Sequence, residues 1–353
     1  MEISSRKIGS FNGEDVCEYT ITNAEGMSIS AMSYGASITA LNVPDYNGKI
    51  KNVALSLDSV DDYITHRPFY GATVGRVAGR IANGEFELNG DTVQVETNEK
   101  GNQLHGGPKG LDTVNWDTHL ETETDEAAIV FTTVDQENNN GYPGNLKVKV
   151  KYILTQANEW KVEYEAETDK ATLFNPTNHT YFNLTGDFTQ TILNHQLKLR
   201  ADKFAPIQEA ALPTGEFEEV NGTPFDFRSG AEIKQGVQLS HPQTELVGGF
   251  DHPFVLNHES SDPEAVLTDP ISGRRIKMFT DQDSVVIFTH NGTVDKYTVQ
   301  GHPAYAYCGI TLETQALPDA INQENFGSII LNPGEIYRAQ TIYQFDAIDP
   351  LSI

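Results

Sequence analysis

Polar and apolar residues alternate with a period of two over much of this 353-residue chain. Between Leu146 and Leu154, apolar residues occupy every second position, and lysines fill most of the positions between them. A polar turn at Gln156–Glu159 follows, after which Trp160–Ala166 alternates in the same way with mostly acidic partners. Alternate residues of a strand point to opposite faces. The pattern therefore predicts an antiparallel hairpin with one apolar face and with lysines opposite glutamates on the other.

Turn signals separate other short apolar runs. Asn89-Gly90, between Glu85–Leu88 and Asp91–Glu96, predicts a tight hairpin because both turn positions favour positive φ. Asp269–Gly273 predicts a further turn, and Ser284–Thr289 predicts a buried strand.

Amphipathic helices are scarce. Short helical turns are expected at Leu57–Ile64, where Asp58 or Ser59 can cap, and near Pro318–Asn325. Many short strands with Gly, Asn and Pro turns run from end to end without a linker. This organisation predicts an all-β protein, a large antiparallel β-sandwich, formed by a single domain over residues 1–353.

The charge of the chain restricts its partners. Lys and Arg total 24 against 50 Asp and Glu, which gives a net charge of −26. A protein with this charge repels phosphate backbones and anionic lipid headgroups, so we expect neither nucleic acid nor membrane partners. Binding of a neutral sugar is not affected by this charge.

Two cysteines and the lack of an apolar leader after Met1 favour a reduced, cytoplasmic setting.

Several catalytic signatures are missing. The chain has no phosphate-binding or dinucleotide-binding glycine motif, no His-Glu-x-x-His zinc motif and no Gly-x-Ser-x-Gly elbow. The ten histidines do not follow a metal-ligand spacing. Acid–base chemistry is the class that remains.

Polar residues crowd two segments that otherwise resemble strands. In the first, Asn175–Leu184, an extended chain places His179, Tyr181 and Asn183 on one face. The alternative is a buried histidine satisfied by its neighbours. In a functional site, the imidazole of His179, the phenol of Tyr181 and the amide of Asn183 would act together on this face.

The second segment, Ile310–Gln315, places Thr311, Glu313 and Gln315 on one face and apolar residues on the other. A carboxylate inside a strand is partly desolvated, which raises its pKa and suits a general base near neutral pH. The alternative is a glutamate on the outer face of an edge strand.

Three further segments are weaker signals. Asn102–Gly107 places His105 before two glycines, which let a backbone approach a ligand closely. Gly75–Ile81 carries Arg76 and Arg80 in an arginine-poor chain, and Gly249–Phe254 carries Asp251.

Taken together and in this order, these segments resemble the aldose 1-epimerase (galactose mutarotase) family. Asn-His-Thr-Tyr-Phe-Asn-Leu at 178–184 and Leu-Glu-Thr-Gln at 312–315 are highly specific, and Leu-Asn-Pro-Gly-Glu-Ile-Tyr at 331–337 is similar to the closing signature of the family. The resemblance runs from about Tyr34 to Phe345.

The resemblance implies a β-sandwich with an open cleft and an enzyme that interconverts the α and β anomers of a free aldose, D-galactose or D-glucose, without a metal or other cofactor. A monomer or homodimer is expected. By the same resemblance the catalytic residues are His179 and Glu313, and the substrate contacts are Arg80, His105, Tyr181 and Asp251.

Ring opening requires a proton to leave the anomeric hydroxyl while another reaches the ring oxygen. The expected roles are Glu313 as the base and His179 as the acid. Two positions depart from the family pattern: Gly79 replaces an Asn of many members, and Val286 replaces a Gln of some members. Both changes predict looser discrimination between galactose and glucose.

Three other functions are compatible with parts of the sequence. A relative acting on sugar phosphates would need several Lys or Arg in the cleft. A non-catalytic carbohydrate-binding sandwich would bind sugar without changing the anomerisation rate. A glycosidase would need a second carboxylate, for which Asp251 is available.

Overall fold

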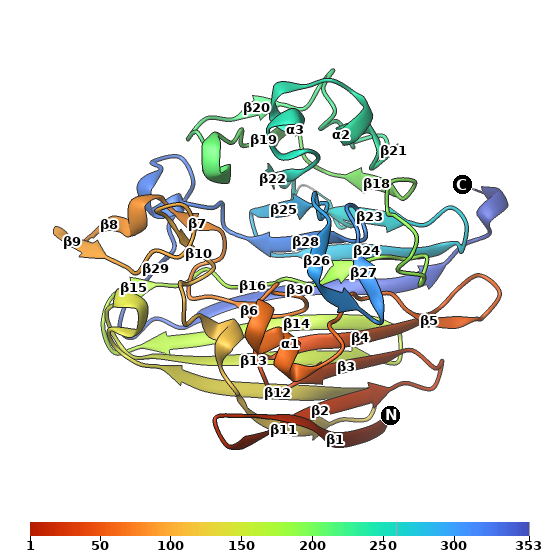
Figure 1. Cartoon of the computed structure of the whole chain (residues 1–353), viewed down its shortest axis with the longest axis horizontal. Coiled ribbons are helices and arrows are strands. Elements are labelled where there is room, and N and C mark those ends of the chain that lie inside the picture. Colours follow the sequence, from red (N-terminus) through yellow and green to blue (C-terminus); the bar gives the residue numbers. More distant parts are fainter. Residues whose placement is uncertain (259, 353) are drawn as a thin grey trace.

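A computed structural model describes residues 1–258 and 260–352 of the chain. Antiparallel strands dominate, and the three large sheets have nine, six and five strands (Figure 1). The prediction of an all-β architecture is confirmed. Within the described residues no helix has the length and the apolar content needed to span a membrane.

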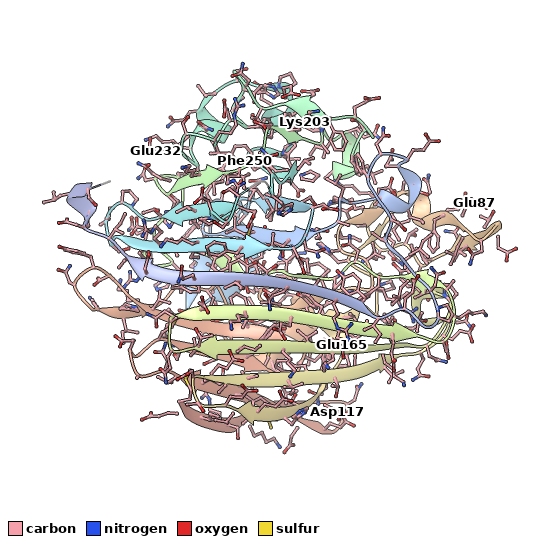
Figure 2. All side chains as sticks on the ribbon, turned by 180° about the vertical axis from the view of Figure 1, so that it is seen from behind. Glu87, Asp117, Glu165, Lys203, Glu232 and Phe250 are labelled. Atoms are coloured by element: carbon pink, nitrogen blue, oxygen red, sulfur yellow. The ribbon has the colours of Figure 1, made fainter. Side chains whose placement is uncertain are left out.

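The nine-stranded sheet forms the broad face of the molecule that is seen from behind in Figure 2. Its strands, in spatial order, are β11 (Asp117–Thr122), β12 (Glu126–Asp135), β13 (Leu146–Thr155), β14 (Glu159–Thr168), β30 (Tyr337–Ala347), β24 (Arg274–Thr280), β23 (Ala265–Thr268), β18 (Gln196–Leu199) and β21 (Ala231–Glu232).

Two smaller sheets share a core with it. The six-stranded sheet contains β17 (Tyr181–Phe182), β28 (Ile310–Gln315), β25 (Ser284–Phe288), β22 (Asp251–Val255), β19 (Lys203–Phe204) and β20 (Glu218–Glu219). The five-stranded sheet contains β1 (Glu2–Phe11), β2 (Glu14–Thr22), β3 (Ser28–Met32), β4 (Ser37–Pro44) and β5 (Ile50–Asn52).

Short pairs and turns complete the fold. The two-stranded pairs are β10 (Gln103–Leu104) with β7 (Arg80–Ile81), β15 (Thr172–Leu173) with β29 (Ile330–Leu331), β16 (Thr177–Asn178) with β6 (Thr73–Val74), β26 (Val294–Val299) with β27 (His302–Ala304), and β8 (Glu85–Leu88) with β9 (Asp91–Gln94). The α-helices are α1 (Val60–His66), α2 (Gln235–Gln238) and α3 (Pro242–Val247), and short 3-10 turns lie at Ala82–Gly84, Leu111–Thr113, Asn139–Gly141, Glu209–Ala211, Ala320–Asn322 and Pro350–Ser352.

The predicted hairpin of period two is β13–β14. Lys147 lies opposite Glu167 and Lys149 lies opposite Glu165, at Nζ–Oε1 distances of 2.9 and 2.6 Å. Glu165 is labelled on the outer face of the sheet in Figure 2. Exposed pairs of this kind contribute at most about 1 kcal/mol each, so the buried apolar face supplies most of the stability of the hairpin.

The local turn predictions are also confirmed. Asn89 and Gly90 join β8 to β9 with φ values of 53° and 88°. Helix α1 begins after Ser59, whose Oγ accepts a hydrogen bond from the Asp62 N–H at 3.2 Å. Ser59 is thus the N-cap.

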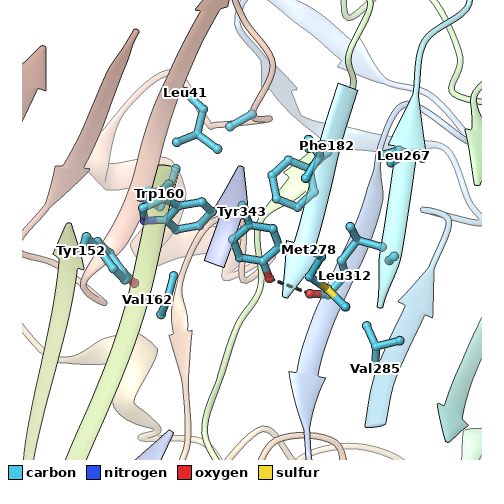
Figure 3. Close-up of a cluster of buried hydrophobic side chains, with 14 of the residues drawn as sticks. Leu41, Tyr152, Trp160, Val162, Phe182, Leu267, Met278, Val285, Leu312 and Tyr343 are labelled. Atoms are coloured by element: carbon cyan, nitrogen blue, oxygen red, sulfur yellow. Dashed lines mark hydrogen bonds between the residues drawn. The ribbon is translucent and has the colours of Figure 1, made fainter. Parts of the chain in front are cut away.

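One buried apolar cluster contains residues of all three large sheets, among them Leu41 of β4, Trp160 of β14 and Leu312 of β28 (Figure 3). Trp160 stacks on Tyr343 of β30 with ring centroids 4.9 Å apart. The Tyr343 hydroxyl donates a hydrogen bond to the Leu312 carbonyl at 2.8 Å. This bond ties the six-stranded sheet to the nine-stranded sheet next to Glu313.

Tyr343→Phe should lower the free energy of unfolding by about 1 kcal/mol, because it removes the hydrogen bond between the sheets. Tyr164→Phe is a matched control: the Tyr164 hydroxyl is buried and has no hydrogen-bond partner among the described residues. Urea titrations of both variants measure the difference. Equal destabilisation by the two substitutions would contradict this account of the sheet packing.

Candidate active site

A cavity of about 180 Å³ lies over four neighbouring strands, β17, β28, β25 and β22. The register places Tyr181 opposite Thr311, Thr311 opposite Phe288, and Phe288 opposite Asp251. Directly opposed residues of antiparallel strands share a face of the sheet. Pairing of the backbone therefore brings Tyr181, Phe288 and Asp251 to the same cavity.

A second row lies two residues further along the same strands. Glu313 of β28 is opposite Val286 of β25, and Val286 is opposite Pro253 of β22. A step of two residues keeps the same face, so Glu313 also points into the cavity, and Thr311 and Gln315 flank it on β28. The prediction that these three residues share a face is confirmed by two hydrogen bonds to the Glu313 carboxyl group.

His179 enters the cavity from the segment between β16 and β17. The backbone N–H of His179 donates to the Ala72 carbonyl at 2.9 Å, and the backbone carbonyl of His179 accepts from the Gly71 N–H at 3.0 Å. The ring of Phe69 lies nearby, 4.8 Å from the ring of His105 and 6.0 Å from that of His179. The segment before β6 thus holds the backbone of His179 in place and lines the cavity with the ring of Phe69.

His105 and Arg80 come from the pair β10–β7, in which Leu104 lies opposite Arg80. The backbone N–H of His105 donates to the Gly79 carbonyl at 2.9 Å. The Gly79 N–H in turn donates to Nδ1 of the His105 ring at 3.2 Å. Gly106 has a φ of 81°, and a Cβ there would lie 1.8 Å from the Gly75 carbonyl oxygen. Only glycine permits this close approach.

The predicted acid and base are in contact. His179 Nε2 lies 3.3 Å from Glu313 Oε1, and both side chains are buried. Thr311 donates a hydrogen bond to Oε1 at 2.9 Å, and Gln315 donates a longer one to Oε2 at 3.4 Å. These donors fix the carboxyl group relative to the imidazole.

Burial changes the proton affinity of both groups. It raises the pKa of Glu313 to about 7, although the hydrogen bond from Thr311 and the charge of Arg80 act against the shift. It lowers the pKa of His179 to about 4. Desolvation penalises the charged form of each residue. Between about pH 4 and about pH 7 the resting pair therefore holds one proton, on Glu313.

His105 is neutral as well, because burial and the neighbouring His179 and Arg80 lower its pKa well below the usual value. Its Nδ1 accepts the hydrogen bond from Gly79, so the ring proton is on Nε2. One ligand atom each of His105, His179 and Glu313 lies within 4.8 Å of the others, a spacing that suits a metal ion. In this tautomer, however, His105 offers a hydrogen-bond donor at Nε2, where a metal would need a lone pair.

Arg80 is held by Glu99 through two hydrogen bonds, from Nε at 2.9 Å and from Nη2 at 3.1 Å. No other described residue accepts a hydrogen bond from this guanidinium, so its remaining donors can bind a ligand. Burial raises the pKa of Asp251 to about 6, and the charge of Arg80 opposes this shift. The two residues form a polar wall of the cavity.

All six residues predicted from the sequence line this cavity: His179, Glu313, Arg80, His105, Tyr181 and Asp251. Asn183 was expected on the same face as His179, but it does not line the cavity. Its amide donates to the carbonyls of Gln190 and Cys308, because β17 ends at Phe182 and the chain turns there.

Arg76 is a structural residue. It is buried outside the lining of the cavity, and its Nε donates to Asp135 Oδ2 at 2.5 Å. The sequence pattern did not distinguish it from Arg80. Phe69 and Glu99 were also missed: Phe69 lies in a segment without a recognisable polar pattern, and Glu99, just before Asn102–Gly107, reaches the site only through its hydrogen bonds to Arg80.

Known proteins with similar sequences show the family of this chain. A sequence model of the aldose 1-epimerase family matches residues 18–344. Among the relatives, maltose epimerase of Levilactobacillus brevis is 36% identical and aligns over 98% of this chain and 99% of its own length. Galactose mutarotase of Bos taurus is 37% identical over 91% of this chain and 92% of its own length.

Solved structures lead to the same family. The crystal structure of galactose 1-epimerase from Lactobacillus acidophilus superposes with a TM-score of 0.89 at 33% identity, covering 99% of each chain. The fold is therefore the galactose mutarotase-like β-sandwich. The chain belongs to the aldose 1-epimerase family, and it is an isomerase that epimerises aldoses at the anomeric carbon.

The two arginines should respond differently to truncation. Arg80→Ala should lower kcat/KM by about 10- to 100-fold through loss of a charged hydrogen bond to the sugar, with little change in stability. Arg76→Ala should lower the free energy of unfolding by about 3–5 kcal/mol, because Asp135 is left buried without its partner. Polarimetry and urea titration of both variants measure these effects; the reverse pattern would contradict the assignment.

Proposed function

We propose that this enzyme interconverts the α and β anomers of free aldohexoses, D-galactose and D-glucose, by acid–base ring opening and reclosure. The observation that carries the proposal is the buried contact of 3.3 Å between His179 Nε2 and Glu313 Oε1 at the floor of the cavity. An acid and a base at this separation can reach the two neighbouring oxygens of a hemiacetal, O1 and O5.

In the proposed step, the Glu313 carboxylate removes the proton of the C1 hydroxyl while the His179 imidazolium donates a proton to O5. The C1–O5 bond breaks and leaves an open-chain aldehyde. Rotation about C1–C2 presents the other face of the carbonyl, and the ring recloses with the proton roles reversed. Each positioned group contributes about 10²- to 10⁴-fold.

The resting proton lies on Glu313, whereas this step begins with the proton on His179. Transfer across the 3.3 Å contact converts the neutral pair into carboxylate and imidazolium without changing the number of protons. Hydroxyl groups of a bound sugar supply hydrogen bonds to both charges and so stabilise the ionised form. Substrate binding thus prepares the pair for the reaction.

The other predicted contacts would orient the sugar. His105 presents an Nε2–H donor, Arg80 presents free guanidinium donors, and Asp251 presents an acceptor when ionised. Tyr181 contributes a hydroxyl beside His179, with their rings 5.1 Å apart. Orientation matters because a misplaced sugar forfeits much of the gain from proximity.

The relatives include a galactose mutarotase and a maltose epimerase, so membership of the family does not by itself determine the sugar. Gly79 and Val286 line the cavity without side-chain hydrogen-bonding groups. This supports the expectation of loose discrimination between galactose and glucose, which differ only at the C4 hydroxyl.

A sugar phosphate is disfavoured as the substrate. Arg80 is the cationic side chain among the described residues of the cavity wall, and Glu99 already neutralises it. Asp251 and Glu313 add negative charge where a phosphate would have to lie.

A cytoplasmic location and a monomeric or homodimeric state stay predictions from the sequence.

Glu313→Gln should lower kcat for the anomerisation of fresh α-D-glucose and α-D-galactose by about 10²- to 10⁴-fold, because the amide cannot accept the proton. His179→Gln should cause a similar loss. Glu219→Gln, an exposed position on β20, is the matched control and should keep full activity. Polarimetry measures the rates, and a loss below about tenfold for His179→Gln would move the acid role to His105.

The pH profile of kcat/KM should fall on the alkaline side with a midpoint near the Glu313 pKa of about 7. Above this pH the pair loses its single proton and no acid remains for O5. It should fall again toward about pH 4, where a second proton on His179 blocks the base. Asp251→Asn should keep the alkaline limb at reduced activity; loss of that limb in this variant would assign it to Asp251.

A further inference from the structure

Arg67 lies next to the active-site cavity without lining it. It is the C-cap residue of helix α1, and its backbone is left-handed, with φ of 46° and ψ of 56°. Phe69, two residues further along the chain, lines the cavity, whereas Arg67 is not among the described residues that do so. Any effect of Arg67 on the reaction must therefore pass through its neighbours.

The guanidinium group of Arg67 makes four hydrogen bonds. Nε donates to Asp112 Oδ2 at 2.6 Å and Nη2 donates to Asp112 Oδ1 at 2.8 Å, which together form a bidentate ion pair. Nη1 donates to the Pro108 carbonyl at 3.0 Å, and Nη2 also donates to the Gly107 carbonyl at 2.8 Å. The planar fork of an arginine can hold a carboxylate and two carbonyls in fixed positions at the same time.

The two carbonyls belong to the loop of residues 105–108, the His105 loop. His105, Gly106 and Gly107 all have positive φ, with values of 51°, 81° and 93°. A residue other than glycine keeps such a conformation only where the surrounding contacts fix it. Gly79 provides these contacts at the start of the loop, and Arg67 provides them at its end.

Arg67 also reaches the His105 ring through Phe69. The central carbon of the guanidinium lies 5.1 Å from the centre of the Phe69 ring, within the range of a cation–π contact. The Phe69 ring in turn packs against the His105 ring, with centroids 4.8 Å apart and an angle of 66° between the planes. Two separate sets of contacts from one side chain thus restrict the His105 imidazole.

We propose that Arg67 is a positioning residue, which holds the His105 loop in the arrangement that presents the Nε2–H of His105 to the sugar. It acts through the carbonyls of Gly107 and Pro108 and through the Phe69 ring. The inference rests on the proposed function, in which His105 orients the sugar and takes no part in the proton transfers. Arg67 therefore affects substrate binding more than the chemical step.

The test measures KM and kcat for the anomerisation of fresh α-D-glucose and α-D-galactose by polarimetry. Arg67→Ala should raise KM by about three- to tenfold, as expected when one hydrogen bond to the substrate is lost. It should lower kcat by less than about twofold, because the acid and the base are held by other contacts.

Arg275→Ala is the matched control. Arg275 pairs with Asp346 through two hydrogen bonds of 2.7 Å, and its side chain is 24% exposed, against 22% for Arg67. It lies on β24 and is not among the described residues of the cavity wall. The loss of a comparable ion pair at this position should leave both KM and kcat unchanged.

A double-mutant cycle separates the positioning of His105 from a general loss of structure. In the His105→Ala enzyme, Arg67→Ala should raise KM by less than about twofold, because the residue that it positions is absent. The same increase in KM with and without His105 would overturn the proposal.

Arg67→Lys provides the test if Arg67→Ala does not fold. The lysine keeps the positive charge and can pair with Asp112, but it lacks the fork that reaches Gly107 and Pro108 at the same time. KM should again rise by about threefold or more. An unchanged KM would overturn the positioning role and leave the proposed function intact, whereas failure of the unmodified enzyme to accelerate anomerisation would overturn the proposed function itself.

Discussion

Backbone pairing of β17, β28, β25 and β22 is the constraint on which the site depends. Because side chains alternate along a strand, a slip of one residue would turn Glu313 into the core and bring Leu312 to the cavity. The large sheet opposes such a slip from behind, since the Tyr343 hydroxyl is bonded to the Leu312 carbonyl and the apolar residues of β28 lie in the shared core. The supporting sheet thus helps to position the Glu313 carboxyl group through the backbone of β28.

Burial supplies the electrostatics of the site. The same desolvation that raises the pKa of Glu313 lowers that of His179, so the two groups share one proton and change between neutral and ionised forms at constant total charge. A reaction that moves one proton off a neutral sugar and another onto it needs this property. On the outer face of β13 and β14 lysines pair with glutamates, so this face adds little to the net negative charge of the chain.

The sequence predicted the strands with clear alternation, the tight turns and the six residues of the cavity, because each carries a local signal or matches a family motif. The local residue pattern alone did not separate Arg76 from Arg80, and only the family resemblance selected Arg80, because the two differ in the partners that tertiary contacts bring to them, Asp135 and Glu99. Asn183 was misplaced because a period of two was extended past Phe182, where β17 ends. Phe69 gave no signal, because its role depends on segments that are distant in sequence.

The hydrogen bond from the Gly79 N–H to His105 Nδ1 has a consequence for how this enzyme can diversify. The donor is a main-chain group, so the tautomer of His105, and with it the Nε2–H proton, does not depend on which side chains surround the ring. Substitutions on the cavity wall can then reshape sugar preference while this contact stays constant. The tautomer of His105 is set by the backbone of the fold, whereas the shape of the cavity depends on side chains that can be substituted.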